Sequence, residues 1–147
     1  MTDERDLARL LQHMAPQMHT ENFVYCSFPD FLVPPGMDPI CTFREAEGIT
    51  AIVEKSQADN SRVPYLFEAK LITLTVHSSL DAIGFLACVA GRLAAAEVPC
   101  NVVAAYHHDH LFVPTAKADE AFSLLMALTS ASPDAPGSMG AVGPALR

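Results

Sequence analysis

Apolar and polar positions repeat with clear periods in the second half of the chain. The segment LITLTV, residues 71–76, alternates every two residues, as a strand does, and continues a strand predicted from about residue 65. A near-continuous apolar run from Leu80 to Val98 predicts a helix that Pro99 ends. Two paired strands and a final helix complete this half, at residues 101–106, 111–113 and 116–129. The predicted order is strand, helix, strand, strand, helix.

The first half has weaker periods. Residues 3–15 place leucines at helical spacing and predict an amphipathic helix that Pro16 ends. A strand follows at 22–28, and then a loop rich in proline and glycine. The remaining predicted elements are a hairpin with strands at 40–43 and 49–53 and a short polar bridge that contains Ala58 and Asp59.

A weak internal repeat relates the two halves. AIVEKSQAD at 51–59 aligns without gaps with LFVPTAKAD at 111–119, with valine, alanine and aspartate coincident. The hairpin 40–53 is therefore the predicted counterpart of the hairpin 101–113. We expect an incomplete N-terminal half at 1–64, a C-terminal half at 65–130 and a disordered tail, rich in proline, glycine and serine, at 131–147.

Charge and composition exclude several classes of function. The net charge is -8, with 9 basic and 17 acidic side chains, so nucleic acid and membrane partners are not expected. The N-terminus has no basic region leading into an apolar one, and the longest strongly apolar run, from Ile83 to Gly91, falls short of membrane-spanning length, which favours a cytoplasmic protein. The four cysteines form no C-x-x-C pair, so neither a disulfide framework nor a zinc knuckle is indicated.

Two longer motifs carry a family resemblance. ITLTVHSSLDAIG, followed by PCNVVAAYHHDHLFVP, resembles ACT-like domains, and residues 1–130, including TFREAEGIT, are similar to uncharacterised bacterial proteins with two ACT-like halves. The resemblance implies an α+β, ferredoxin-like (βαββαβ) fold in two tandem halves, with antiparallel sheets and helices on one face. It also implies a regulatory protein that senses an amino acid, with the ligand between paired modules and hence a homodimer or an intramolecular pair.

The best candidate binding site is the junction between the strand ending near Val76 and the helix expected to follow. A helix N-terminus offers unpaired N–H groups to an anion such as an amino-acid carboxylate. The candidate ligand-binding residues here are His77, Ser78, Ser79, Leu80, Ile83 and Gly84, and the resemblance adds Asn101 and Val102. Several of them have a structural alternative: Ser79 as an N-cap, Gly84 as a packing residue and Asn101 as a polar residue at a strand edge.

The cluster HHDH, at 107–110, is interpreted first as a hairpin turn. On a strand, His108 and His110 face one way and His107 and Asp109 the other, so one metal ion would collect only two of them. A metal site and a ligand-facing or pH-sensitive role remain the alternatives. No catalytic residue, metal or cofactor is predicted.

The sequence therefore predicts a non-catalytic sensor that binds a small molecule, expected to be an amino acid, and acts as an oligomer. One alternative is a structural or protein-interaction module without a ligand. The other is a metal-dependent enzyme that uses the HHDH turn.

Overall fold

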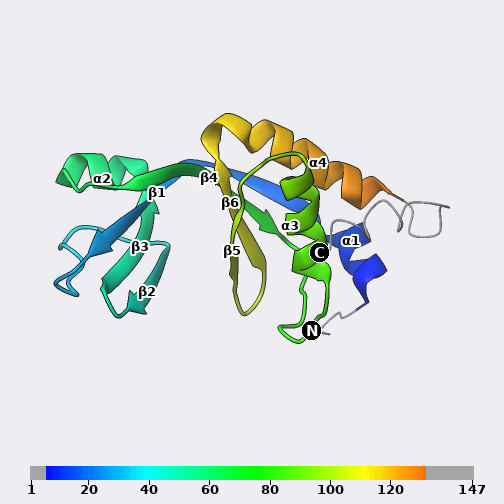
Figure 1. The fold of residues 1–147 in the computed structure, drawn as a ribbon, viewed down its shortest axis with the longest axis horizontal. Coiled ribbons are helices and arrows are strands. Elements are labelled where there is room, and N and C mark those ends of the chain that lie inside the picture. The colour runs from blue at the N-terminus through cyan, green and yellow to red at the C-terminus, as the bar shows by residue number, and fades with distance from the viewer. Residues whose placement is uncertain (1–5, 132–147) are drawn as a thin grey trace. The chain divides into compact units, whose positions relative to one another are not determined.

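The computed structural model of the protein describes residues 6–131 (Figure 1). Its elements along the chain are α1 (Leu7–His13), β1 (Pro16–Phe28), β2 (Cys41–Glu45), β3 (Gly48–Glu54), α2 (Lys55–Ser61), β4 (Leu66–Leu74), α3 (Phe85–Ala95), β5 (Asn101–Ala104), β6 (Asp109–Pro114), the short 3₁₀ helix η1 (Thr115–Lys117) and α4 (Ala118–Ser130). Hydrogen-bonded strands follow the order β2-β3-β1-β4-β6-β5. The pairs β1–β3, β2–β3 and β5–β6 are antiparallel, as the predicted fold class requires.

The chain forms two compact units. Unit 1 comprises the described parts of Met1–His19 and Leu71–Arg147, and unit 2 comprises Thr20–Lys70, so β1 and β4 each contribute to both. The predicted boundaries at 64/65 and 130/131 divide the chain into tandem halves rather than into these units, and they stay a prediction. Residues 132–147 of the predicted disordered tail, 131–147, lie outside the described residues.

The core of unit 1 depends on the two-residue alternation of its strands. Ile72 and Leu74 of β4 and Leu111 and Val113 of β6 are fully buried, and they share one cluster with residues of α1, α3 and α4. Thr73, between Ile72 and Leu74, points to the opposite face of the strand. The three helices of unit 1 therefore cover the same face of β4 and β6, as predicted.

The predicted helix from Leu80 to Val98 is too long at both ends, because α3 runs only from Phe85 to Ala95. At its start, the N–H of Ala82 donates to the carbonyl of Ser79 at 2.9 Å, which makes a turn, and Gly84 has a left-handed φ of 89°. At its end, Glu97 also has a positive φ, and the N–H of Val98 donates to Leu93 at 2.9 Å in a Schellman arrangement. Local backbone turns, which an apolar run does not reveal, set both boundaries.

Three predictions for the first half need correction. Within the described residues, the first helix covers only Leu7–His13, because the side chain of Asp6 caps it and Ala15 has a positive φ. The strand predicted at 22–28 begins at Pro16, a position where a strand tolerates proline. The predicted polar bridge is the helix α2, which has no apolar period but buries Ala58 completely.

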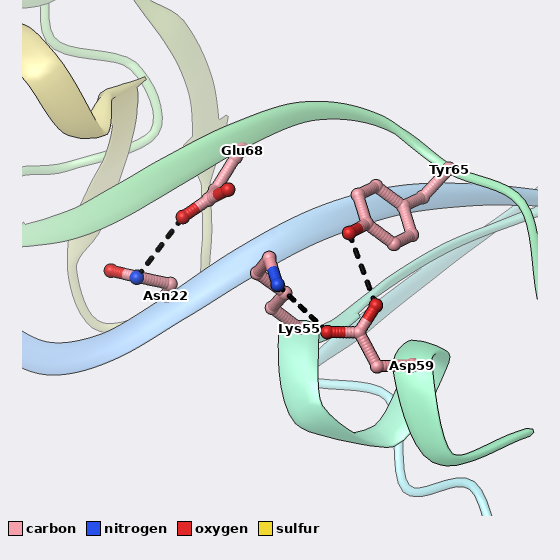
Figure 2. A network of polar contacts seen from close by, with 5 residues as sticks. All are labelled: Asn22, Lys55, Asp59, Tyr65 and Glu68. Carbon is pink, nitrogen blue, oxygen red and sulfur yellow. Dashed lines mark hydrogen bonds and ion pairs between the residues drawn. The ribbon is translucent and has the colours of Figure 1, made fainter. Parts of the chain in front are cut away.

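A polar network anchors α2 within unit 2 (Figure 2). Lys55 and Asp59, one turn apart on α2, form an ion pair of 2.7 Å, and the hydroxyl of Tyr65 donates to Asp59 at 3.1 Å. Next to it, the amide nitrogen of Asn22 donates to the carboxylate of Glu68 at 3.1 Å. The hydroxyl of Tyr65 gives this helix of only seven residues a partner outside its own turn, which short helices need for stability.

A substitution at Gly48, the first residue of β3, tests the close backbone packing of unit 2. Its φ is +144°, and a Cβ placed there would collide with the carbonyl oxygen of Phe28 and lie 2.8 Å from Pro29 Cα. We expect Gly48→Ala to lower the free energy of unfolding by about 2–5 kcal/mol, because backbone strain and overpacking add. Denaturant titration measures the change.

Gly36→Ala is the matched control. Gly36 also has a positive φ, +90°, but nothing lies within 4 Å of a Cβ there. Its cost should be that of a left-handed residue alone, about 1–2 kcal/mol. Equal losses in the two variants would contradict the close contact at Gly48.

Candidate functional site

The segment that joins β4 to α3 is held by two hydroxyl groups. The Oγ of Ser78 donates to Oδ2 of Asp109, the first residue of β6, at 2.7 Å. The Oγ of Ser79 accepts from the N–H of Asp81 at 3.1 Å, within the local turn. Ser79 is therefore a turn residue and does not cap α3.

Gly84 occupies the N-cap position of α3 and supplies no side chain to cap it. The first intrahelical bond runs from the N–H of Cys88 to the carbonyl of Gly84 at 2.9 Å. A helix of 11 residues carries a partial positive charge at its N-terminus, where the N–H groups of the first turn have no intrahelical acceptor. This end of α3 attracts negative charge.

A cavity of about 120 Å³ lies at this junction, within unit 1. Its wall comes from three places: the β4–α3 segment, the first turn of α3 and the start of the β5–β6 hairpin. The lining residues are Ser78, Ser79, Leu80, Ala82, Gly84, Phe85, Leu86, Ala87, Ala104 and Asp109. The cavity thus combines a helix N-terminus with the carboxylate of Asp109, which is only 4% exposed.

Half of the predicted binding residues line this cavity, namely Ser78, Ser79, Leu80 and Gly84. The other four are not among its lining residues. His77 packs on His108, and Ile83 is 88% exposed. Asn101, on β5, is exposed and pairs with Phe112 of β6. Val102 packs at the edge of the unit 1 core. Whether any of the eight contacts a ligand stays a prediction.

The sequence interpretation missed Asp109 and Ala104 as wall residues. The signal for Asp109 was its place two and four residues before Leu111 and Val113, which puts all three on the core-facing side of β6. Ala104 pairs with Asp109 across the hairpin, so it follows once the register is known. The register of the β5–β6 pair is known only from the structure.

The HHDH cluster contains a hairpin connection, as predicted. The N–H of Ala105 donates to the carbonyl of His108 at 3.0 Å, and β5 and β6 pair on either side. Asp109, however, belongs to β6 and is buried rather than part of the connection. Across residues 6–131, no group of three or more histidine, cysteine, aspartate or glutamate side chains is arranged to hold a metal ion.

All four cysteines are free thiols. Burial raises the pKa of Cys88 and of Cys100 to about 11, so both thiols are protonated at neutral pH and are poor nucleophiles.

Among the helices of residues 6–131, none is long and apolar enough to cross a membrane.

Comparisons with known proteins agree with this architecture. ACT domains match residues 2–70 and residues 66–127 of the chain. A solved structure of a protein of unknown function from Vibrio cholerae, described as a possible transport protein, is 37% identical. That alignment covers 84% of this chain and 96% of the Vibrio chain, with a TM-score of 0.75. Among curated proteins, none matches the chain.

More distant structures share the fold alone. A protein from Agrobacterium tumefaciens is 16% identical, over 74% of this chain and 81% of its own, with a TM-score of 0.59. The regulatory subunit of aspartate kinase from Thermus flavus is 9% identical, over 77% of this chain and 95% of its own, with a TM-score of 0.57.

The fold therefore defines an α+β, ferredoxin-like protein of two tandem ACT-like halves, which confirms the predicted fold class. The chain belongs to the ACT domain family. Membership supports a ligand-binding regulatory role in general terms, since ACT domains are regulatory domains.

The hydrogen bond between Ser78 and Asp109 should stabilise the wall of the cavity. We expect Ser78→Ala to lower the free energy of unfolding by about 1–3 kcal/mol, because it removes a donor from a buried carboxylate. Ser123→Ala, at an exposed position on α4, removes the same atom and should change stability by less than about 0.5 kcal/mol. Thermal and denaturant unfolding compare the two, and an equal effect would show that this hydrogen bond contributes nothing.

Proposed function

We propose that the protein is a non-catalytic sensor that binds a free amino acid in the cavity between the start of α3 and Asp109. The observation that supports this proposal is the pairing of opposite electrostatic features in one small cavity. An amino acid carries a carboxylate and an ammonium group separated by one carbon atom. The helix N-terminus suits the carboxylate, and the carboxylate of Asp109 suits the ammonium group.

The size of the cavity favours a metabolite of this class. Its volume of about 120 Å³ exceeds the roughly 10–15 Å³ that one water molecule requires and is below the roughly 300–1,000 Å³ of sites for drug-sized ligands. Leu80 and Phe85 add apolar surface against which a short side chain can pack. A simple anion such as phosphate fits less well, since Asp109 would repel it.

The predicted anion site is thereby refined. The helix N-terminus predicted at the junction selects a negative charge. The buried carboxylate of Asp109 adds a requirement for a positive charge on the same ligand. Selection for both charges separates amino acids from keto acids and other simple carboxylates.

Binding should be visible when the protein is titrated with each of the twenty amino acids. We expect one or a few of them to raise the melting temperature and to release heat in calorimetry, because a ligand that binds only the folded state stabilises it. The corresponding keto acid, which lacks the ammonium group, should bind at least about tenfold more weakly. If no amino acid changes the melting temperature or releases heat, the proposal is wrong.

Two variants test whether the ligand binds in this cavity. Asp109→Asn keeps an oxygen that can accept from Ser78 but loses the charge, so affinity should fall at least about tenfold. Ala104→Leu, at an exposed position of β5, should block the cavity with little effect on folding. Asp119→Asn, on the exposed first turn of α4, is the charge-matched control and should bind like wild type.

We further propose that the sensor acts as a homodimer in the cytoplasm. Leu80, in the cavity wall, is 68% exposed, Ile83 is 88% exposed, and Tyr106 on the β5–β6 connection is 83% exposed. Large apolar side chains exposed at adjacent positions of one segment are typical of surfaces that a partner covers. The same surface would serve an interaction module without a ligand, the second candidate function.

Sedimentation of two variants distinguishes a dimer from a monomer. Ile83→Ser should weaken self-association at least about tenfold, whereas Leu32→Ser, at a side chain of unit 2 that is 68% exposed, should not. A monomer at all concentrations would refute the dimer. A dimer that responds to no amino acid would favour the interaction module.

A further inference from the structure

Five of the six histidines lie in one continuous array within unit 1. It begins on β1, where Nε2 of His19 lies 2.9 Å from Oγ1 of Thr73 on β4. The same hydroxyl lies 3.0 Å from Nδ1 of His110 on β6. The array then continues by ring contacts from His110 to the histidines at 108, 77 and 107.

The ring contacts join the β5–β6 hairpin to the segment before the cavity. His108 lies 6.3 Å from His110 between ring centroids and 4.7 Å from His77, with the last two rings tilted by 39°. His77 also meets His107 edge-on at 5.9 Å, and the ring of Tyr106 lies 4.8 Å from that of His107. His77 is thus in contact with two histidines of the hairpin.

Hydrogen bonding at Thr73 favours neutral rings. Thr73 is 7% exposed, and its hydroxyl carries one hydrogen and two acceptor sites. With neutral imidazoles, it can donate to one ring and accept from the other. If both rings are protonated, both donate to Thr73, and its own hydrogen has to find another acceptor in a buried place.

The surroundings of the array act mostly in the same direction. Burial lowers the pKa of His108, and His77 and His107 lower it further. Burial also lowers the pKa of His110, with added contributions from His108 and His19. Asp109 is the opposing charge and raises both pKa values by a smaller amount.

The array is connected to the cavity through two pairs of adjacent residues. His77 precedes Ser78, and His108 precedes Asp109, while Ser78 and Asp109 share the 2.7 Å hydrogen bond in the cavity wall. Because successive side chains of an extended chain point to opposite sides, each pair has its histidine in the array and its partner at the cavity. The same two backbone segments therefore form both features.

We propose that protonation of this histidine array detaches the segment 77–84 from the β5–β6 hairpin and opens the cavity wall at acidic pH. Two positive charges on rings as close as those of His77 and His108 repel each other, and the neutral stack is lost. The consequence for ligand affinity rests on the proposed function. The detachment itself does not.

The direction of the pH dependence follows from the neutral preference. Histidines whose protonation is disfavoured in the folded arrangement hold the segment fully above about pH 6.5, the ordinary value for histidine. Attachment is lost as the pH falls from there through the lowered pKa values of His108 and His110.

Amide hydrogen exchange of the ligand-free protein, in buffer with a metal chelator, tests the detachment. After correction for intrinsic exchange, we expect protection of residues 77–84 to fall by about tenfold between pH 7.5 and pH 5.5, a factor typical of coupling between two sites. Protection of α4 should stay constant, which separates local opening from general acid unfolding. Unchanged protection at 77–84, or an equal loss in α4, would overturn the proposal.

Three variants assign the effect to the array. His108→Gln and His77→Gln each remove one ring of the closest pair, and in both the fall in protection should shrink to less than about threefold. His13→Gln is the control, because His13 lies on α1, outside the array, and its Nδ1 contacts the carbonyl of Arg9. Wild-type pH dependence in both array variants would overturn the proposal. Since no ligand is present, failure here leaves the amino-acid proposal intact, and a failure to bind amino acids leaves this one intact.

Discussion

The alternation of side chains along β6 is the constraint on which unit 1 depends. Leu111 and Val113 must face α1, α3 and α4, because burying them contributes to the only large apolar cluster of that unit among the described residues. Burial of these two residues also fixes the direction of their neighbours. Asp109 is brought to the cavity with Ser78, and His110 is turned to the other face toward Thr73. A shift of one residue would exchange the two sets and would bury an imidazole in the helix-covered core.

This arrangement is the structural basis of the ligand binding proposed for this ACT-domain protein. The cavity offers two opposite electrostatic features, a helix N-terminus and one carboxylate, together with the apolar surface of Leu80 and Phe85. In the HHDH cluster, the strand sends Asp109 and His110 to opposite faces, and the described residues offer no group of three metal ligands. Binding and regulation are the uses that the geometry favours.

The repeat within the chain is structural as well as sequential. The β2–β3 hairpin leads directly into α2, as the β5–β6 hairpin leads into η1 and α4. The aligned segments 51–59 and 111–119 therefore cover the same strand-to-helix transition in both halves. The alignment carried enough information to predict α2, but the polar composition of KSQADNS concealed it. A helix that buries only Ala58 has no apolar period to detect.

Sequence alone determined the order of strands and helices in the C-terminal half, both hairpins, the family and the region of the cavity, because these follow from period, composition and motif. Tertiary structure alone decided where α3 begins, since the turn at Ser79 and the left-handed Gly84 interrupt an apolar run that looks uniformly helical. It also decided that Asp109 lines the cavity. His19 and His77, both distant in sequence from the HHDH cluster, are brought to the histidines of that cluster by the fold alone. Such contacts depend on strand register and on which residues share a face, and a single sequence specifies these only through the packing of the whole core.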